Sequence, residues 1–139
     1  MIRIVLADDD AGVRAALRAL FDDDERFTVV GEAIDAESCL IQVRQVHPDV
    51  VLLDARMPGT GLAAVRQLRS CSASVACVVL SARLDAALLA RFIEAGVQGA
   101  FDKGASSDSL PDLIARCAAG ERVLHARATE DALRLLSSD

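Results

Sequence analysis

Short apolar runs alternate with longer amphipathic segments along the whole chain, and this alternation restricts the fold more than any other feature of the sequence. The stretches "DVVLLD" (49–54) and "SVACVVLS" (74–81) are apolar almost throughout, as is typical of parallel strands that are covered on both faces. Strands are therefore expected at residues 2–7, 27–33, 49–54, 75–81 and, more weakly, 97–102.

The segments between these runs have the periodicity of amphipathic helices. In the first segment, the i, i+3, i+4, i+7, i+8 spacing of one helix face is occupied by Val13, Ala16, Leu17, Leu20 and Phe21. Similar patterns predict helices near residues 40–46, 62–68, 88–93 and 110–117. This alternation predicts an α/β protein with a flavodoxin-like, doubly wound, five-stranded parallel sheet of order 2-1-3-4-5 and helices on both faces. One further helix is expected at residues 126–136.

The composition limits the class of protein and its surroundings. A chain of 139 residues fits one domain, and its net charge of -6 argues against direct binding of nucleic acid phosphates. Cys39, Cys71, Cys77 and Cys117 have no metal-binding spacing, so they are expected to be small buried residues in a reducing compartment. No apolar run reaches the roughly 18 residues of a membrane span and no signal-peptide pattern is present. A cytoplasmic location without membrane association is therefore expected.

Polar residues fall at the ends of four of the expected strands. Asp8 and Asp9 follow the first strand, Asp54 ends the third, Ser81 ends the fourth, and Lys103 follows the fifth. Ligands of doubly wound sheets bind beyond the carboxyl ends of the strands, so these residues are expected to converge. Three carboxylates in one crevice repel each other unless a cation lies between them, and the oxygen preference of Mg²⁺ suits them.

This set of residues is also suited to phosphoryl transfer. A carboxylate can act as a nucleophile and form an acyl phosphate. Mg²⁺ and Lys103 would then offset negative charge on the transferring group, and Ser81 would donate a hydrogen bond to it.

The motifs that carry these residues resemble the receiver domain of two-component response regulators. They are "VLADDD" (5–10), "VVLLDARMPG" (50–59), "VVLSA" (78–82) and "GAFDKG" (99–104). Each of these motifs is common alone, but the four occur in register, and the resemblance extends from about residue 2 to residue 124.

The resemblance implies a role for each residue of the site. Asp54 would accept the phosphoryl group, and Mg²⁺ would be held by Asp8, Asp9, Asp54 and the backbone carbonyl of Arg56. Ser81, Ala82 and Lys103 would bind the phosphoryl group, with Ser81 as the hydroxyl that switches. Asp10 is interpreted instead as the start of the first helix, where a carboxylate caps free N–H groups.

"VVGEA" (29–33), "HPDVVLLD" (47–54) and "AAGERVL" (118–124) resemble in particular the receivers that precede a helix-turn-helix DNA-binding domain. Residues 1–124 would then form the receiver and residues 125–139 a linker helix to a truncated output domain, the only part expected to bind DNA. The expected partners are a sensor histidine kinase and a second copy of the chain, bound through the face of the fourth helix, fifth strand and fifth helix. The domain would be a phosphoacceptor and no enzyme beyond self-phosphorylation from small phosphodonors and autodephosphorylation.

Some residues depart from the pattern of that family. Its members usually have an aromatic residue three positions before the lysine, where this chain has Ala100, and Phe101 follows on the opposite face of the expected strand. Either a bulge shifts the strand, or the aromatic half of the switch is absent. The loop "MPGTGL" (57–62) is one residue shorter than usual. Arg56 and Arg83 flank the expected site and are either solvated or in reach of the phosphoryl group.

Three other functions are compatible with parts of the sequence. A degenerate receiver would keep the fold and signal by binding alone. A dinucleotide-binding enzyme is suggested only by "GTGLAA" (59–64), which follows the third strand instead of the first. A phosphatase of the haloacid dehalogenase type would need a second carboxylate two residues after Asp54, where Arg56 stands. A phosphorylation-controlled switch is the function that the sequence favours.

Overall fold

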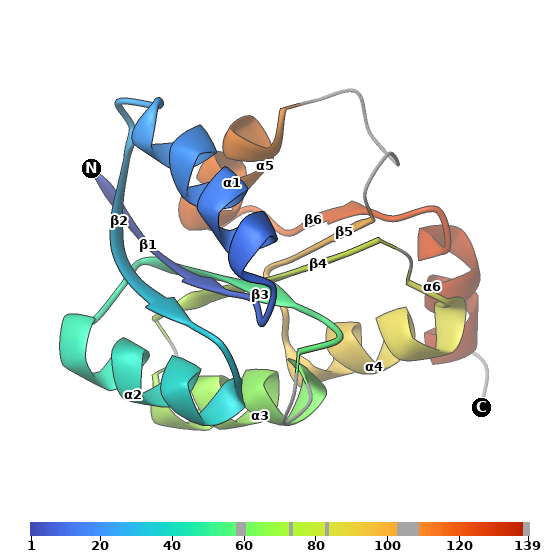
Figure 1. Cartoon of the computed structure of the whole chain (residues 1–139). Helices are drawn as coiled ribbons and strands as arrows, with labels where there is room; N and C mark the ends of the chain where they lie inside the picture. Colours follow the sequence, from blue (N-terminus) through green and yellow to red (C-terminus); the bar gives the residue numbers. More distant parts are fainter. Residues whose placement is uncertain (58–60, 73, 83, 103–108, 138–139) are drawn as a thin grey trace.

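A computed structural model describes residues 1–57, 61–72, 74–82, 84–102 and 109–137. A six-stranded sheet lies between two layers of helices (Figure 1). The strands are β1 (Ile2–Ala7), β2 (Phe27–Ala33), β3 (Val50–Asp54), β4 (Ala76–Ser81), β5 (Gly99–Asp102) and β6 (Val123–His125). The helices are α1 (Ala11–Asp22), α2 (Ala36–Val46), α3 (Gly61–Cys71), α4 (Ala86–Ala95), α5 (Leu110–Ala118) and α6 (Thr129–Ser137).

The sheet is parallel throughout, with the order β2-β1-β3-β4-β5-β6. The predicted order 2-1-3-4-5 is confirmed for the first five strands, but the predicted number of five strands is wrong. The sixth strand pairs with the outer edge of β5, where Gly99, Ala100 and Phe101 lie opposite Val123, Leu124 and His125. Three residues are too few to give an alternating pattern, and the pairing itself satisfies an edge that would otherwise be open.

The strands are buried because each face of the sheet packs against its own layer of helices. Val51 and Leu53 of β3 belong to the apolar cluster on the side of α2, α3 and α4. Val50 and Leu52 belong to the cluster on the side of α1 and α5. Alternate residues of one strand therefore serve two cores, which is why the run reads as continuously apolar in the sequence.

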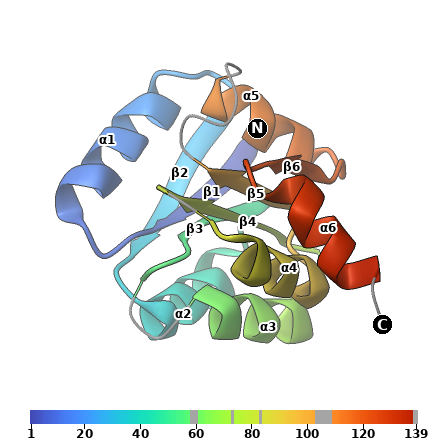
Figure 2. The same ribbon diagram turned by 90° about the vertical axis from the view of Figure 1, so that its right-hand side faces the viewer.

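The predicted C-terminal helix is present as α6, and it packs beside α4 (Figure 2). Ala132 of α6 is 0% exposed and joins the same apolar cluster as α4, whereas the neighbouring Leu133 is 46% exposed. The predicted boundary between the receiver and the linker, after Leu124, falls inside β6.

One prediction about the cysteines is wrong. Cys39, Cys77 and Cys117 are buried as expected, but Cys71 at the end of α3 is exposed. Cys71 is the last residue of α3, one turn beyond the buried residues Ala64, Val65 and Leu68.

Among the described helices, none has the length and apolar character needed to cross a membrane.

Candidate phosphoacceptor and metal site

The carboxyl ends of β1, β3 and β4 surround a cleft of about 260 Å³. Its polar lining comes from the ends of these strands and the loops that follow them, as expected at the switch point of a doubly wound sheet. The lining residues with polar or charged side chains are Asp8, Asp9, Asp10, Asp54, Arg56 and Ser81. Ala82 also lines the cleft.

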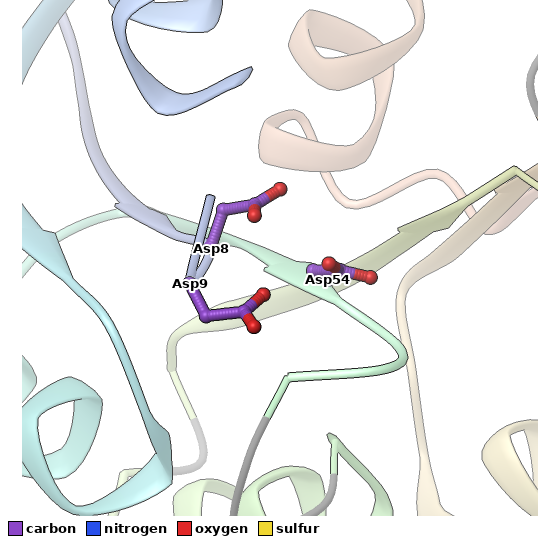
Figure 3. Close-up of side chains that lie close together, drawn as sticks. All are labelled: Asp8, Asp9 and Asp54. Carbon is purple, nitrogen blue, oxygen red and sulfur yellow. The ribbon is translucent and has the colours of Figure 1, made fainter. Parts of the chain in front are cut away.

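Three carboxylates meet in this cleft. Asp8 and Asp9 follow β1, Asp54 ends β3, and the three side chains face one common space (Figure 3). One carboxylate oxygen from each residue lies within 4.8 Å of the other two. Asp8 is 6% exposed, Asp54 is half-buried and Asp9 is exposed. The predicted convergence of these side chains is what the structure describes.

The cluster is electrostatically unfavourable when its carboxylates are all ionised. Burial raises the pKa of Asp8, and the charges of Asp54, Asp9 and Asp10 raise it further. A backbone hydrogen bond of 2.8 Å from the N–H of Asp10 to Oδ1 of Asp8 acts in the opposite direction and is the second-largest effect on this pKa. A bound cation would relieve the same repulsion.

Asp10 caps α1, as the sequence predicted. Its Oδ1 accepts hydrogen bonds from the backbone N–H groups of Gly12, at 2.8 Å, and Val13, at 3.0 Å. This carboxylate is therefore used by the helix, although it lies on the border of the cleft.

The turn after Asp54 is held by two hydrogen bonds to Asp54 itself. The backbone N–H of Arg56 donates to Oδ1 of Asp54 at 3.0 Å, and that of Met57 donates to the backbone carbonyl at 3.2 Å. Met57 is buried, which fixes the direction in which the chain leaves the cleft, while Arg56 is exposed at its border. One carboxylate oxygen of Asp54 is thus engaged by the turn.

Ser81 ends β4 at the opposite wall of the cleft and is 3% exposed. Its position places a hydroxyl in the same cleft as Asp54, as predicted. Two other predicted site residues, Arg83 and Lys103, lie outside the described residues. The same is true of residues 58–60 in the shortened loop.

Phe101 does not take the place of the missing aromatic. The pairing of β5 is continuous with β4 and with β6 across Gly99–Asp102 and Gly99–Phe101 respectively, so no bulge shifts the described strand. Ala100 faces the α4 side, and Phe101 is buried on the α5 side in an edge-to-face contact with His125. Of the two alternatives, the structure supports the absence of an aromatic at this position.

Sequence reasoning missed one residue that supports the acidic cluster. Arg14 of α1 donates from Nη1 to the backbone carbonyl of Asp8 at 2.8 Å and from Nε to Glu32 at 3.0 Å. Arg18 also pairs with Glu32. These contacts tie the loop after β1 to the end of β2. In the sequence, these contacts are indicated only by the spacing of Arg14 and Arg18, which lie four residues apart on one helix.

The donor set of the cleft fits Mg²⁺. Three carboxylates from two strand ends supply hard oxygen ligands, and the cleft is open enough to leave room for water or phosphate oxygens. The three residues of the cluster are all aspartates, and these ligands do not favour a softer metal, which would prefer Cys or His.

Comparison with known proteins agrees with this arrangement. Residues 4–115 match the family model of the response regulator receiver domain, and the chain belongs to this family. It is 34% identical over 125 residues to the response regulator GacA of Pseudomonas aeruginosa, a match that covers 89% of this chain and 58% of GacA. Identity to the response regulator UvrY of Escherichia coli is also 34%, over 89% of this chain and 57% of UvrY. The chain thus spans less than two thirds of these two relatives.

Solved structures show the same fold. A LuxR family response regulator from Aurantimonas has a TM-score of 0.89 at 27% identity, and the match covers 99% of each chain. The receiver domain of the putative response regulator NarL from Mycobacterium tuberculosis has a TM-score of 0.81 at 28% identity over 86% of this chain and 98% of that one. The chain is therefore a signalling domain of the two-component type.

Proposed function

We propose that this receiver domain is switched by phosphorylation of Asp54. The observation that carries the proposal is the meeting of Asp54 with Asp8 and Asp9 within 4.8 Å, in a cleft that also contains Ser81. A half-buried carboxylate opposite two others has the position of a nucleophile supported by a cation site.

The proposed reaction transfers one phosphoryl group to Asp54. A carboxylate oxygen of Asp54 forms a bond to phosphorus as the bond from phosphorus to the donor breaks, and the bonding electrons leave with the donor. Since Oδ1 accepts the N–H of Arg56, we assign the attack to Oδ2. The hydroxyl of Ser81 would donate a hydrogen bond to the phosphoryl oxygens, and Lys103 would contribute a positive charge.

Mg²⁺ belongs to the same proposal. Asp8, Asp9, Asp54 and the backbone carbonyl of Arg56 would hold the ion, which supplies positive charge against the phosphoryl oxygens. Arg14 would position the loop that carries Asp8 through its hydrogen bond to the Asp8 carbonyl.

The proposed partners follow from the family. A sensor histidine kinase would donate the phosphoryl group, in the cytoplasm, and the domain would act on an output domain that binds DNA. The lengths of GacA and UvrY support a longer regulator, because this chain aligns with just over half of each. A homodimer through α4, β5 and α5 completes the proposal.

Intact-mass measurement with acetyl phosphate and Mg²⁺ tests the proposal. The wild-type chain is expected to gain one phosphoryl group, and Asp54→Asn to gain none. Asp10→Asn is a matched control that changes an acidic residue at the same cleft while keeping a capping oxygen, and it should still be phosphorylated. Absence of the adduct in the wild type, or its persistence in Asp54→Asn, would contradict the proposal. The absence of any adduct from a phosphorylated kinase as well would favour a receiver that signals by binding alone.

A further inference from the structure

Residues 122–137, here called the C-terminal segment, cover part of the surface assigned above to the homodimer. Strand β6 lies along the outer edge of β5, and α6 lies beside α4 (Figures 1 and 2). All three elements of that surface, α4, β5 and α5, are therefore in contact with the segment.

The described contacts hold the segment at its first residue, at its strand and at its helix. Arg122 donates from Nη2 to the backbone carbonyl of Ile93, in the last turn of α4, at 2.8 Å. The strand pairs with β5 from Val123 to His125. Ala132 is fully buried in the cluster that contains the inner residues of α4.

The attachment of α6 is made by small side chains. Ala128 and Ala132, spaced by four residues, belong to the cluster with α4, and Leu136 adds a partly buried edge. Leu133 and Leu135 remain 46% and 51% exposed. Contacts between small side chains require close approach of the two helices, so a small displacement of α4 removes much of the attraction.

The covered surface is connected to the phosphoacceptor site by a short path. Ser81 ends β4, and α4 is capped by Asp85 only four residues later. Figure 1 shows α6 next to the first turns of α4, the end that follows this loop. In the switch inferred below, a movement of Ser81 toward a phosphoryl group on Asp54 changes the position of these turns relative to α6.

Ala100 stands at the position where other receivers usually have an aromatic residue. Ala100 is 0% exposed and lies opposite Leu124 of β6. Ala100 and Leu124 belong to the same apolar cluster as Ala132 and the inner face of α4. An alanine has no side-chain torsion to rotate, so the route proposed for a change at Ser81 runs through α4 and the segment that packs on it.

We propose that the C-terminal segment is an intramolecular cover of α4 and β5, and that phosphorylation of Asp54 releases it. The proposal rests on the proposed phosphorylation of Asp54. Release exposes the side of α4 and the edge of β5 to a second copy of the chain. In the unphosphorylated protein the cover keeps the same surface from pairing.

Hydrogen–deuterium exchange of the whole chain tests the release. Peptides from residues 122–137 are followed in metal-free protein, with Mg²⁺, and with Mg²⁺ and beryllofluoride as a phosphoryl analogue. Exchange in these peptides is expected to rise by about tenfold or more with beryllofluoride and to stay unchanged in Asp54→Asn. Formation of the acetyl phosphate adduct is measured on the same protein by mass. An adduct without faster exchange in residues 122–137 would overturn the cover while leaving the phosphorylation intact, whereas the absence of any adduct would overturn the phosphorylation and the cover together.

Two variants of α6 test whether release of this helix changes binding at the phosphoacceptor site. Ala132→Glu places a charge in the buried contact and should release α6 without phosphorylation, whereas Leu133→Glu places the same charge on the exposed face. Because coupling between two sites is reciprocal, Ala132→Glu should bind beryllofluoride about fivefold or more tightly than Leu133→Glu. Equal affinities in the two variants would overturn the proposal. Release of the C-terminal segment would leave β1–β5 and the other five described helices in place.

Discussion

Asp8 and Asp10 are joined by a hydrogen bond of 2.8 Å, from the backbone N–H of Asp10 to Oδ1 of Asp8, yet their carboxylates serve different parts of the molecule. The carboxylate of Asp8 is buried in the acidic cluster, and that of Asp10 caps α1. The roles of Asp8 and Asp10 can therefore be distinguished by experiment, although both residues belong to one charged run.

Replacing Asp8 should make the metal-free protein more stable and the metal site weaker. Asp8→Asn removes one of three carboxylates that lie within 4.8 Å of each other. The free energy of unfolding without metal is expected to rise on the order of 1 kcal/mol, because like-charge repulsion is relieved. Mg²⁺ affinity should fall by roughly tenfold or more, equivalent to about 1.4 kcal/mol. Urea unfolding with and without Mg²⁺ measures both effects, and lower metal-free stability in Asp8→Asn would contradict the repulsive cluster.

The stability difference between the wild type and Asp8→Asn should depend on pH. The pKa of Asp8 is raised in the folded protein by burial and by its acidic neighbours, so the folded state binds this proton more tightly than the unfolded state. Metal-free wild-type protein therefore gains stability relative to Asp8→Asn as the pH falls from 7 through the raised pKa toward the ordinary value of 3.8. Unfolding midpoints of both proteins across this range test the sign. A difference that stays constant with pH would contradict it.

Replacing Asp10 should weaken α1 instead of the metal site. Asp10→Ala removes the oxygen that accepts the N–H groups of Gly12 and Val13. Loss of such a cap lowers the free energy of unfolding by about 1 kcal/mol. Asp10→Asn retains a capping oxygen and serves as the matched control, with a much smaller expected change. A Mg²⁺ affinity that fell as far in Asp10→Ala as in Asp8→Asn would show that Asp10 is also a ligand.

Alkylation of native protein should modify Cys71 alone among the four cysteines. Burial raises the pKa of Cys39 and Cys77 to about 12 and that of Cys117 to about 11. The exposed Cys71 has a lowered pKa because Arg44 donates a hydrogen bond to its sulfur at 3.7 Å. Since the thiolate is the reactive form, Cys71 should react faster at neutral pH than an ordinary thiol. Iodoacetamide and intact mass should give one adduct, none in Cys71→Ser, and a slower one in Arg44→Gln. Rapid addition of further adducts to the native chain would contradict the burial of the other three.

Gly99 of β5 should not tolerate a side chain. A Cβ at this position would lie 2.7 Å from Sγ of Cys117, 3.1 Å from Cζ of Phe101 and 3.3 Å from the backbone oxygen of Val123. Gly99→Ala is therefore expected to lower the free energy of unfolding by about 1–3 kcal/mol through overpacking. The double variant Gly99→Ala with Cys117→Ala should be more stable than the sum of the two single changes predicts. Strict additivity in a double-mutant cycle would show that Cys117 is not the atom in the way.

The sequence predicted the parts of the fold in which a local pattern and the final environment agree. The strands expected at 2–7 and 27–33 are Ile2–Ala7 and Phe27–Ala33. Asp8 directly follows the first run, and Arg26 directly precedes the second. The meeting of Asp8, Asp9 and Asp54 was also predictable, since the carboxyl ends of neighbouring parallel strands share one edge.

The remaining features depend on contacts between distant parts of the chain. The strand β6 exists through its pairing with β5, and the burial of Ala132 depends on which surface α6 meets. The hydrogen bond from Arg14 to Asp8 depends on how α1 lies over the sheet, and the exposure of Cys71 depends on which neighbours cover the end of α3. None of these can be read from spacing along one segment.

The late position of β6 in the chain matters during synthesis. Until residues 123–125 have emerged and paired, β5 presents its outer backbone edge, with Ala100 and Phe101 on its two opposite faces. An open apolar edge of this kind promotes pairing between nascent chains. Pairing of β6 with β5 is thus expected to protect the newly made domain from aggregation.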